Sequence, residues 1–520
     1  MSKKFNVTGN CFPNQHYIAD VSQKMTAIFK LIQEGEYFII NRPRQYGKTT
    51  TLFAIAHSLR QKEAYLPFNI SFEGIGNSPF ESEVSFTKTF TRLLARYARH
   101  SAPTLVEWLK KKSLEVQTFD DLGDCITDLT ELTSQKIVLL IDEVDQSSNN
   151  DIFIKFLGLL RNKYLSRGDE TTFYSVILAG VHDVKSLKMK IRADSDQKYN
   201  SPWNIAADFK VDMNLYPHEI QPMLDDYVRE RGVPMDTAEM SYGLFYYTSG
   251  YPFLVSRLCK IIDEDILPTK KTSNWTLEDL EIAVKRLVKE NNTNFETQVK
   301  NLENNPDLYD AVYEIAIENE SHPFNIHNPI TNLAMMYGLF VERNGRIAIH
   351  NRIYNEVLSN YMIDKLYRTK LPKRRDFGNH YHNDDKTLNM EAVLLGFQSL
   401  MKREYNRKDR DFLEKHARLV FLAFLKPIIN GAGYDFKEPQ ISEEKRLDVV
   451  ITYYEHKYIA ELKLWRGRKA HEKGLIQLND YLDSQQLNEG YLLIFDHNEI
   501  KNWATEWITV HGKRIFMIWV

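Results

Sequence analysis

The chain has 520 residues, of which 43% are hydrophobic and 26% charged, a composition typical of a globular protein with several domains. A formal net charge of −3 excludes a global attraction to nucleic acid, so any such contact needs a local basic patch. The scattered cysteines Cys11, Cys125 and Cys259 exclude a clustered metal site or a disulfide framework, which fits a reducing compartment. Without an apolar signal-peptide core or a run of about 20 apolar residues, we expect a cytoplasmic protein without membrane contact.

The first 214 residues alternate between helical and strand patterns. A helical pattern over residues 16–34 precedes the first strand. Apolar strand patterns then occur at residues 37–40, 66–72, 137–141 and 173–179, with helical patterns between them. Near-continuous apolar strands are typical of a parallel sheet that is buried on both faces. The sequence therefore predicts an α/β domain with a parallel sheet over residues 1–214.

A phosphate-binding loop is indicated by the stretch YFIINRPRQYGKTT at residues 37–50. Its turn leads into a helix, whose unpaired N–H groups and dipole favour an anion at that end. Lys48 is expected to bridge the β- and γ-phosphates of ATP, and the Thr49 hydroxyl to bind Mg²⁺. Arg42 stands where this motif usually has its first glycine. The expected nucleotide-binding residues of the loop are Arg44, Gln45, Tyr46, Gly47, Lys48, Thr49 and Thr50.

Asp142 and Glu143 follow the strand pattern at residues 137–141. An ATPase with a phosphate loop needs such acids at the end of a second strand, beside the loop. Asp142 would hold Mg²⁺ directly or through water, and Glu143 would act as the general base for the attacking water. Asp145 is a further candidate for orienting the site. An apolar run that ends in Asp can also simply terminate a buried strand. The GKT sequence upstream, in the right order, favours the ATPase interpretation.

Two further positions have open interpretations. His182 and Asp183 follow the strand pattern at residues 173–179 and either approach the γ-phosphate or only begin a loop. Arg257 either reaches the nucleotide from a helical lid or, as we favour, is a surface or core-edge arginine.

Strand patterns stop after residue 214, and residues 215–300 read as a helical lid. Two helical patterns and a hairpin at Asn344-Gly345 then predict a winged-helix-like module over residues 301–370. A basic run at residues 365–375 leads into a linker, which we place at residues 371–390. Such a run either contacts phosphates or, as we favour, is a solvated connector.

Residues 391–520 contain a second set of candidate site residues. Strand patterns at residues 447–453 and 458–464 flank a turn at residues 455–457. Glu461 and Lys463 are two apart on one strand and share a face, and hairpin pairing brings Asp448 alongside. Two carboxylates suit a hard divalent cation, which polarises a scissile phosphate and activates water. Alternating charges on an edge strand are also ordinary, so the pattern alone is weak.

Several stretches together resemble one family, the AAA-ATPase-like proteins that carry a C-terminal PD-(D/E)XK nuclease-superfamily domain. They are HYIAD, YFIINRPRQYGKTT, LLIDEVD, LAGVHDVKSLK, SPWNIAADF and SGYPFLVSRLC. The resemblance implies an AAA+/STAND-like P-loop core with a helical lid, followed by a PD-(D/E)XK nuclease-like α/β domain. It also implies that Glu414 is the acid of the first core helix and a metal ligand. Gln477 and Tyr481 match a Q-x-x-x-Y pair that positions substrate or supports the site.

These observations predict an ATP-binding and ATP-hydrolysing protein whose nucleotide state controls metal-dependent cleavage of nucleic acid, DNA rather than RNA. The expected cofactors are ATP and Mg²⁺, with Mn²⁺ as an alternative at the nuclease site. The sequence leaves the oligomeric state open, with a homo-oligomer as one candidate. The alternative is a STAND-like switch whose nuclease-like domain only binds nucleic acid or a partner. The predicted catalytic residues are Glu143, Asp448, Glu461 and Lys463. The predicted metal ligands are Thr49, Asp142, Glu414, Asp448 and Glu461.

Overall fold

The computed structural model describes residues 2–144, 151–181, 203, 205–317, 320–370, 381–404, 420–425, 428–429, 433–436, 449–454, 456–464, 468–496 and 503–520. The chain divides into two compact units, Met1–Leu308 with Pro323–Asn355, and Tyr309–His322 with Glu356–Val520. Each helix in the described ranges is too short or too polar to cross a membrane.

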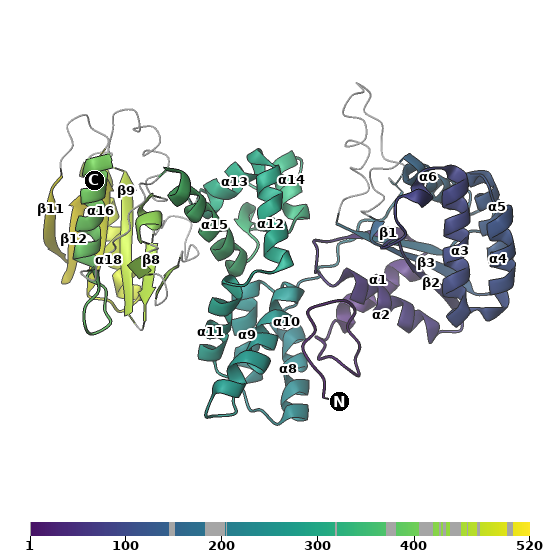
Figure 1. Ribbon diagram of the computed structural model, residues 1–520, viewed down its shortest axis with the longest axis horizontal. Coiled ribbons are helices and arrows are strands. Elements are labelled where there is room, and N and C mark those ends of the chain that lie inside the picture. The colour runs from purple at the N-terminus through teal and green to yellow at the C-terminus, as the bar shows by residue number, and fades with distance from the viewer. Residues whose placement is uncertain are drawn as a thin grey trace, which may run out of the picture. The chain divides into compact units, whose positions relative to one another are not determined.

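A parallel sheet organises the first unit (Figure 1). Among the described residues its strands are β1 (Tyr37–Asn41), β2 (Tyr65–Ser71), β3 (Lys136–Asp142) and β4 (Ser175–Gly180). They lie in the order β1-β4-β3-β2, and all neighbouring pairs are parallel. A bridge between Phe38 and Ala207 adds a further parallel contact to β1. The predicted parallel α/β sheet is therefore confirmed.

Two hydrophobic cores lie on the two faces of this sheet, because alternate strand residues point in opposite directions. Ile39, Leu139 and Leu178 belong to one core, and Phe38 and Ile177 to the other. The first core is completed by α3 (Glu83–Ser101), α4 (Val106–Glu115), α5 (Phe119–Glu131) and α6 (Asp151–Leu165). The second is completed by α1 (Ser22–Gln33) and α2 (Lys48–Arg60). Burial on both faces explains the near-continuous apolar strands.

The helix expected over residues 16–34 begins only at Ser22, so its predicted start is wrong. His16 instead forms a bridge with Lys4, and its Nδ1 accepts a hydrogen bond from the Phe12 N–H at 2.8 Å. These contacts hold the segment before α1 in a non-helical conformation that its apolar spacing did not reveal.

The rest of the first unit is mainly helical. Its α-helices are α8 (Pro217–Arg231), α9 (Thr237–Thr248), α10 (Pro252–Ile261), α11 (Leu277–Val288), α12 (Thr293–Asn304) and α14 (Pro329–Met336). Short 3-10 or π-helical turns lie at Ser78–Phe80, Pro103–Leu105, Ile262–Ile266 and Leu267–Thr269. Strands β5 (Phe340–Arg343) and β6 (Arg346–Ile349) form an antiparallel hairpin. Asn344 and Gly345 both have positive φ angles of 52° and 76°, as expected of a two-residue hairpin turn.

The second unit contains a mixed sheet in the order β11-β12-β10-β9-β8-β7. Its strands are β7 (Gly433–Phe436), β8 (Val449–Tyr453), β9 (His456–Leu464), β10 (Glu489–Phe495), β11 (Thr505–Val510) and β12 (Lys513–Trp519). Strands β7, β8 and β9 pair antiparallel, and β10 pairs parallel to both β9 and β12. Helix α18 (Arg468–Ser484) makes the crossover from β9 to β10, which a parallel pair requires.

Three more helices belong wholly or partly to this unit, namely α13 (Pro306–Ala316), α15 (Arg352–Lys370) and α16 (Met390–Glu404). The boundary between the two units falls within α13 and α15. One local prediction is wrong. Strand β9 begins at His456, which pairs with Tyr453, so His456 and Lys457 belong to the strand rather than to the turn.

Candidate functional site

The loop between β1 and α2 has the backbone of a phosphate-binding turn. Gln45 and Gly47 have positive φ angles of 58° and 79°, and Gly47 is the N-cap residue of α2. The left-handed conformation explains a glycine at position 47. Because glycine has no side chain, the N-cap residue cannot occupy the first N–H groups of the helix. The start of α2 therefore keeps the features that favour a bound anion.

Lys48 lies inside the curve of this loop. Its side chain is 6% exposed, and its ammonium donates hydrogen bonds to the carbonyl oxygens of Arg42 at 2.9 Å and Pro43 at 3.0 Å. Carbonyl oxygens are neutral acceptors, so these two hydrogen bonds do not cancel the positive charge of the ammonium. These contacts also tie the first helical residue to the beginning of the loop.

Arg42 replaces the usual glycine without filling the loop. Its guanidinium lies 5.2 Å from the Phe209 ring centre and donates hydrogen bonds to the carbonyls of Asn41 at 2.9 Å and Val211 at 2.7 Å. Burial lowers the pKa of this guanidinium. The side chain therefore anchors the segment at residues 209–211.

The two predicted acids lie where β3 ends. Asp142 is buried, and its carboxylate accepts a hydrogen bond from the Glu143 N–H at 2.9 Å. Glu143 has a φ of 57°, an uncommon conformation for a residue other than glycine and one often found at functional sites. Since β1 and β3 run in the same direction with β4 between them, the loop and the acids follow the same edge of the sheet. Asp145, His182 and Asp183 lie outside the described residues.

The loop residues Arg44 and Tyr46 contact parts of the unit that sequence reasoning did not connect to them. The buried Tyr46 hydroxyl is hydrogen-bonded to the Asn214 Oδ1, and it lies 3.0 Å from the His350 Nε2. The Tyr251 hydroxyl donates a hydrogen bond to the Arg44 carbonyl at 2.5 Å. No local signal identifies these partners, because the Tyr46–His350 contact spans 304 residues of sequence. Thr50 is nearer to its partner in sequence, and its hydroxyl accepts a hydrogen bond from the Cys11 N–H at 3.3 Å.

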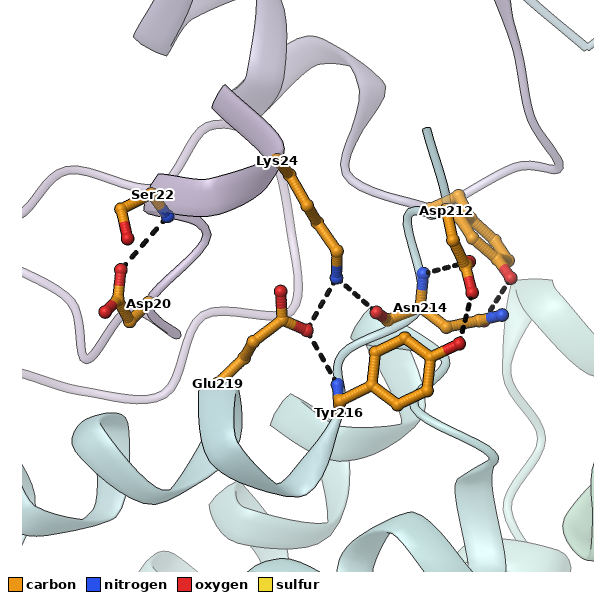
Figure 2. A network of polar contacts seen from close by, with 8 residues as sticks. Asp20, Ser22, Lys24, Asp212, Asn214, Tyr216 and Glu219 are labelled. Carbon is orange, nitrogen blue, oxygen red and sulfur yellow. Dashed lines mark hydrogen bonds and ion pairs between the residues drawn. The ribbon is translucent and has the colours of Figure 1, made fainter. Parts of the chain in front are cut away.

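A polar network joins the start of α1 to the start of α8 (Figure 2). Lys24 and Glu219 form an almost buried ion pair at 2.6 Å, and the Lys24 ammonium also donates to the Asn214 carbonyl. Asp212 accepts hydrogen bonds from the Asn214 N–H at 2.9 Å and the Tyr216 hydroxyl at 2.6 Å. The hydrogen bond to Asp212 raises the pKa of Tyr216 to about 12. The network thus fixes the segment that carries Asn214, beside a cavity of about 490 Å³.

Arg257 lies on α10 and is engaged by an acid. Its guanidinium donates hydrogen bonds to the Glu290 carboxylate at 3.0 and 2.5 Å. This bidentate pair, whose Arg257 side chain is 24% exposed, agrees with the favoured interpretation of a surface or core-edge arginine.

In the second unit, β9 and α18 bring three predicted residues together. The Lys463 ammonium lies 2.7 Å from the Glu461 carboxylate and donates a hydrogen bond to the Gln477 side-chain carbonyl at 3.1 Å. Glu461 is fully buried, whereas Lys463 is 28% exposed. Gly474 of α18 packs against the Lys463 side chain so closely that a Cβ at this glycine would lie 3.3 Å from the Lys463 Cε.

Tyr481 lies one helical turn after Gln477 and is buried in the core below α18. Its hydroxyl has no hydrogen-bond partner within the described parts of the chain. Asp448 and Glu414, the other predicted metal ligands, lie outside the described residues.

The sequence match to a known family decides the nature of the first site. Residues 10–360 match the family described as AAA-like domain, and this stretch contains the loop, both acids and the helical region. The chain belongs to the AAA-like domain family. Its AAA-like domain is accordingly an ATP-binding and ATP-hydrolysing P-loop domain, for which ATP and Mg²⁺ are the expected ligands. Asp142 and the Thr49 position fit Mg²⁺ because both offer oxygen ligands.

Three of the solved structures similar to this chain are a Walker-type ATPase, an ORC2 protein and a RuvB protein. A Walker-type ATPase of Pyrococcus abyssi is 12% identical, with 68% of this chain and 99% of that chain covered and a TM-score of 0.47. The ORC2 protein of Aeropyrum pernix is 11% identical, with 69% and 96% covered and a TM-score of 0.38. RuvB of Thermotoga maritima is 15% identical, with 71% and 100% covered and a TM-score of 0.34. Because these TM-scores are under 0.5, the family assignment depends on the sequence match alone. A comparison with curated proteins gives no match.

Proposed function

We propose that this protein is an AAA-like ATPase whose nucleotide state controls a metal-dependent nuclease centre in its second unit. In the ATPase, Lys48 would bind the β- and γ-phosphates while Thr49 and Asp142 hold Mg²⁺. Glu143 would accept a proton from the attacking water. Arg44, Gln45, Tyr46, Gly47 and Thr50 would complete the nucleotide contacts.

The observation that carries the nuclease half is the cluster of Glu461, Lys463 and Gln477 on β9 and α18. Glu461 would hold a divalent cation together with Asp448 and Glu414, and such a cation polarises a phosphate and activates water. Lys463 would then stabilise negative charge on the phosphate under attack. Gln477 and Tyr481 would position the substrate or support the site, and Gln477 accepts a hydrogen bond from the Lys463 ammonium at 3.1 Å.

The topology of the second unit supports a PD-(D/E)XK nuclease-like domain. An antiparallel β7-β8-β9 meander is followed by the crossover helix α18 and the parallel strand β10. Strand β8 pairs Val449 with Ala460, and the sequence neighbours of this pair are Asp448 and Glu461. We accordingly propose domain boundaries at 1–214 for the ATPase, 215–300 for the lid, 301–370 for the winged-helix-like module, 371–390 for the linker and 391–520 for the nuclease-like domain.

A second candidate function is a STAND-like ATPase switch whose nuclease-like domain binds nucleic acid or a partner without cleaving it. The ion pair between Lys463 and Glu461 favours it, because a buried carboxylate paired with a lysine is also a purely structural arrangement.

The test is a cleavage assay with the purified full chain on DNA and RNA, omitting ATP and Mg²⁺ or Mn²⁺ in turn. We expect metal-dependent cleavage, of DNA before RNA, at a rate that changes with ATP. Lys463→Ala should lower this rate by about 100- to 1,000-fold, the typical effect of losing one donor to a developing negative charge. Light scattering of the same samples tests for the candidate homo-oligomer.

Lys457→Ala is the matched control for this assay. Lys457 lies on the same strand and hydrogen-bonds the Gln485 side chain at 2.7 Å, so it is also a lysine paired with a glutamine. Its loss should leave cleavage unchanged. Binding of DNA without any metal-dependent cleavage by the wild type, or equal rates for Lys463→Ala and wild type, would favour the non-catalytic switch.

A further inference from the structure

We propose that Tyr46 and His350 form a positioning pair through which the β5-β6 hairpin sets the shape of the phosphate loop. The inference rests on the assignment of the nucleotide site to Lys48. Tyr46 would contact the nucleotide through its backbone, while its side chain and His350 would act by holding the loop that surrounds Lys48.

The hydrogen-bonding capacity of the groups fixes the direction of each bond around Tyr46. A side-chain amide oxygen only accepts, so the Tyr46 hydroxyl must donate its single proton to the Asn214 Oδ1. The Tyr46 oxygen is then an acceptor, and the His350 Nε2, at 3.0 Å, must donate to it. His350 is therefore the tautomer that carries its proton on Nε2.

The other side of the imidazole fits the same tautomer. The Asn351 Nδ2 lies 3.3 Å from the His350 Nδ1, and an amide nitrogen only donates, so Nδ1 must be the unprotonated acceptor. Burial lowers the pKa of His350 to about 4, which keeps this ring neutral at pH 7. Two amides and one phenol thus define a single chain of hydrogen bonds, from Asn351 through His350 and Tyr46 to Asn214.

The backbone of His350 is held by the hairpin. Its N–H donates to the Leu339 carbonyl at 2.8 Å, and its carbonyl accepts from the Arg343 guanidinium at 2.9 Å. The position of the imidazole therefore follows the position of β5 and β6.

Packing around the loop adds to the same connection. The Tyr46 ring lies edge-on to Tyr251, with centroids 4.6 Å apart at 74°, and His350 lies edge-on to Tyr251 at 5.6 Å and 81°. Gly338, just before β5, lies so close to Pro43 that a Cβ there would meet the Pro43 Cγ at 2.7 Å. The loop is thus held at both Pro43 and Tyr46 by residues near the hairpin.

These contacts reach the lysine through two backbone carbonyls. Lys48 hydrogen-bonds the carbonyls of Arg42 and Pro43, so a shift of Pro43 changes the atoms that hold the ammonium. Gln45, which precedes Tyr46, has a positive φ angle of 58°, and a residue other than glycine populates this conformation poorly without tertiary support. Removing the Tyr46–His350 hydrogen bond should therefore loosen the phosphate loop around Lys48.

The experiment measures the dissociation constant for ATP with Mg²⁺ in the full chain. Tyr46→Phe keeps the ring and removes the hydroxyl, and His350→Leu keeps the bulk and removes the donor. We expect each to weaken ATP binding by about tenfold, the typical cost of leaving a buried polar group unsatisfied. Because both remove the same bond, the double variant should be weakened by much less than the product of the two effects.

His350→Gln is the conservative rescue. Its Nε2 lies as many bonds from Cα as the histidine Nε2 and can donate to Tyr46, so ATP affinity should stay within about twofold of wild type. Tyr227→Phe is the matched control, because Tyr227 is a buried tyrosine that donates to Asp263 at 2.6 Å. It should lower thermal stability and leave ATP affinity unchanged.

The outcomes separate the pair from the nucleotide site. ATP affinity unchanged in Tyr46→Phe, or lost equally in His350→Gln and His350→Leu, would overturn the positioning pair while Lys48→Ala still loses binding. Retained affinity in Lys48→Ala would overturn the nucleotide site itself.

Discussion

Each of the two units has one candidate site lysine, and the groups that bind the two ammonium groups differ. Lys48 is held by two neutral carbonyls and is 6% exposed. Lys463 is held by the fully buried Glu461 carboxylate and the Gln477 amide, and it is 28% exposed. The two carbonyls that hold the first lysine accept its hydrogen bonds without cancelling its charge. The second belongs to a pair with no net charge, so it attracts a phosphate only once another cation engages Glu461.

The largest expected effect tests whether Lys463 balances the charge of the buried Glu461 carboxylate. Lys463→Met should lower the free energy of unfolding of the second unit by about 3 kcal/mol, because the Glu461 carboxylate stays buried without its ammonium partner. Adding Glu461→Gln to this variant should restore most of the loss, since the charge is then gone. Urea unfolding at pH 7 measures both. A Lys463→Met variant as stable as wild type would mean that the ion pair does not compensate Glu461.

The next effect tests whether the first lysine binds the phosphates of ATP. Lys48→Ala should raise the dissociation constant for ATP by about 100-fold, equivalent to about 2.7 kcal/mol, because charge-assisted bonds to phosphate are lost. Titration calorimetry with Mg²⁺ measures this change. Lys62→Ala is the control, because Lys62 is an exposed lysine just beyond the same helix and lies over the Phe29 ring at 4.7 Å. Equal affinities for the Lys48 and Lys62 variants would remove Lys48 from the nucleotide site.

The two regions also differ in what their sequences could predict. The phosphate loop and the acids of β3 are local patterns, a strand followed at once by its chemistry, so residues 37–50 and Asp142 were readable directly. In the second unit, the period of two along β9 was enough to put Glu461 and Lys463 on one face. Gln477 became a candidate only through resemblance to a family, and its contact with Lys463 was not predicted, since no periodicity links a strand residue to a helix residue.

Contacts between distant segments were beyond sequence reasoning in both units. The Tyr46 contacts span 168 residues to Asn214 and 304 residues to His350, and hydrophobic patterning carries no information about such pairs. Arg42 is a related case, because it stands where the motif usually has its first glycine. In the structure its side chain leaves the loop and binds the Val211 carbonyl, which explains why a large residue is accepted.

The smallest expected effect concerns the pH dependence of the first unit and rests on His350. Burial lowers the pKa of His350 from 6.5 to about 4, and among the groups that face it the Arg343 charge lowers the pKa further while Asp212 opposes the shift. Tyr46 and Asn351 contribute neutral hydrogen-bonding partners. Between pH 6.5 and about 4 the unfolded chain binds a proton at this position that the folded chain does not. The stabilisation is therefore complete above pH 6.5 and is lost as the pH falls toward 4.

From pH 7.5 to pH 5.5 this linkage amounts to about 1.3 kcal/mol of unfolding free energy. Carboxylates titrate in the same range in every variant, so the informative quantity is the difference between wild type and His350→Gln, which keeps the donor and cannot be protonated. We expect wild type to lose about 1.3 kcal/mol more than His350→Gln over this interval. Parallel pH profiles would show that His350 takes up its proton in the folded protein near its ordinary pKa. In that case the hydrogen-bond chain to Tyr46 would not hold the imidazole neutral. The phosphate loop would then be held at Tyr46 by a group that becomes charged, and it would no longer differ in this respect from β9, where Lys463 pairs with Glu461.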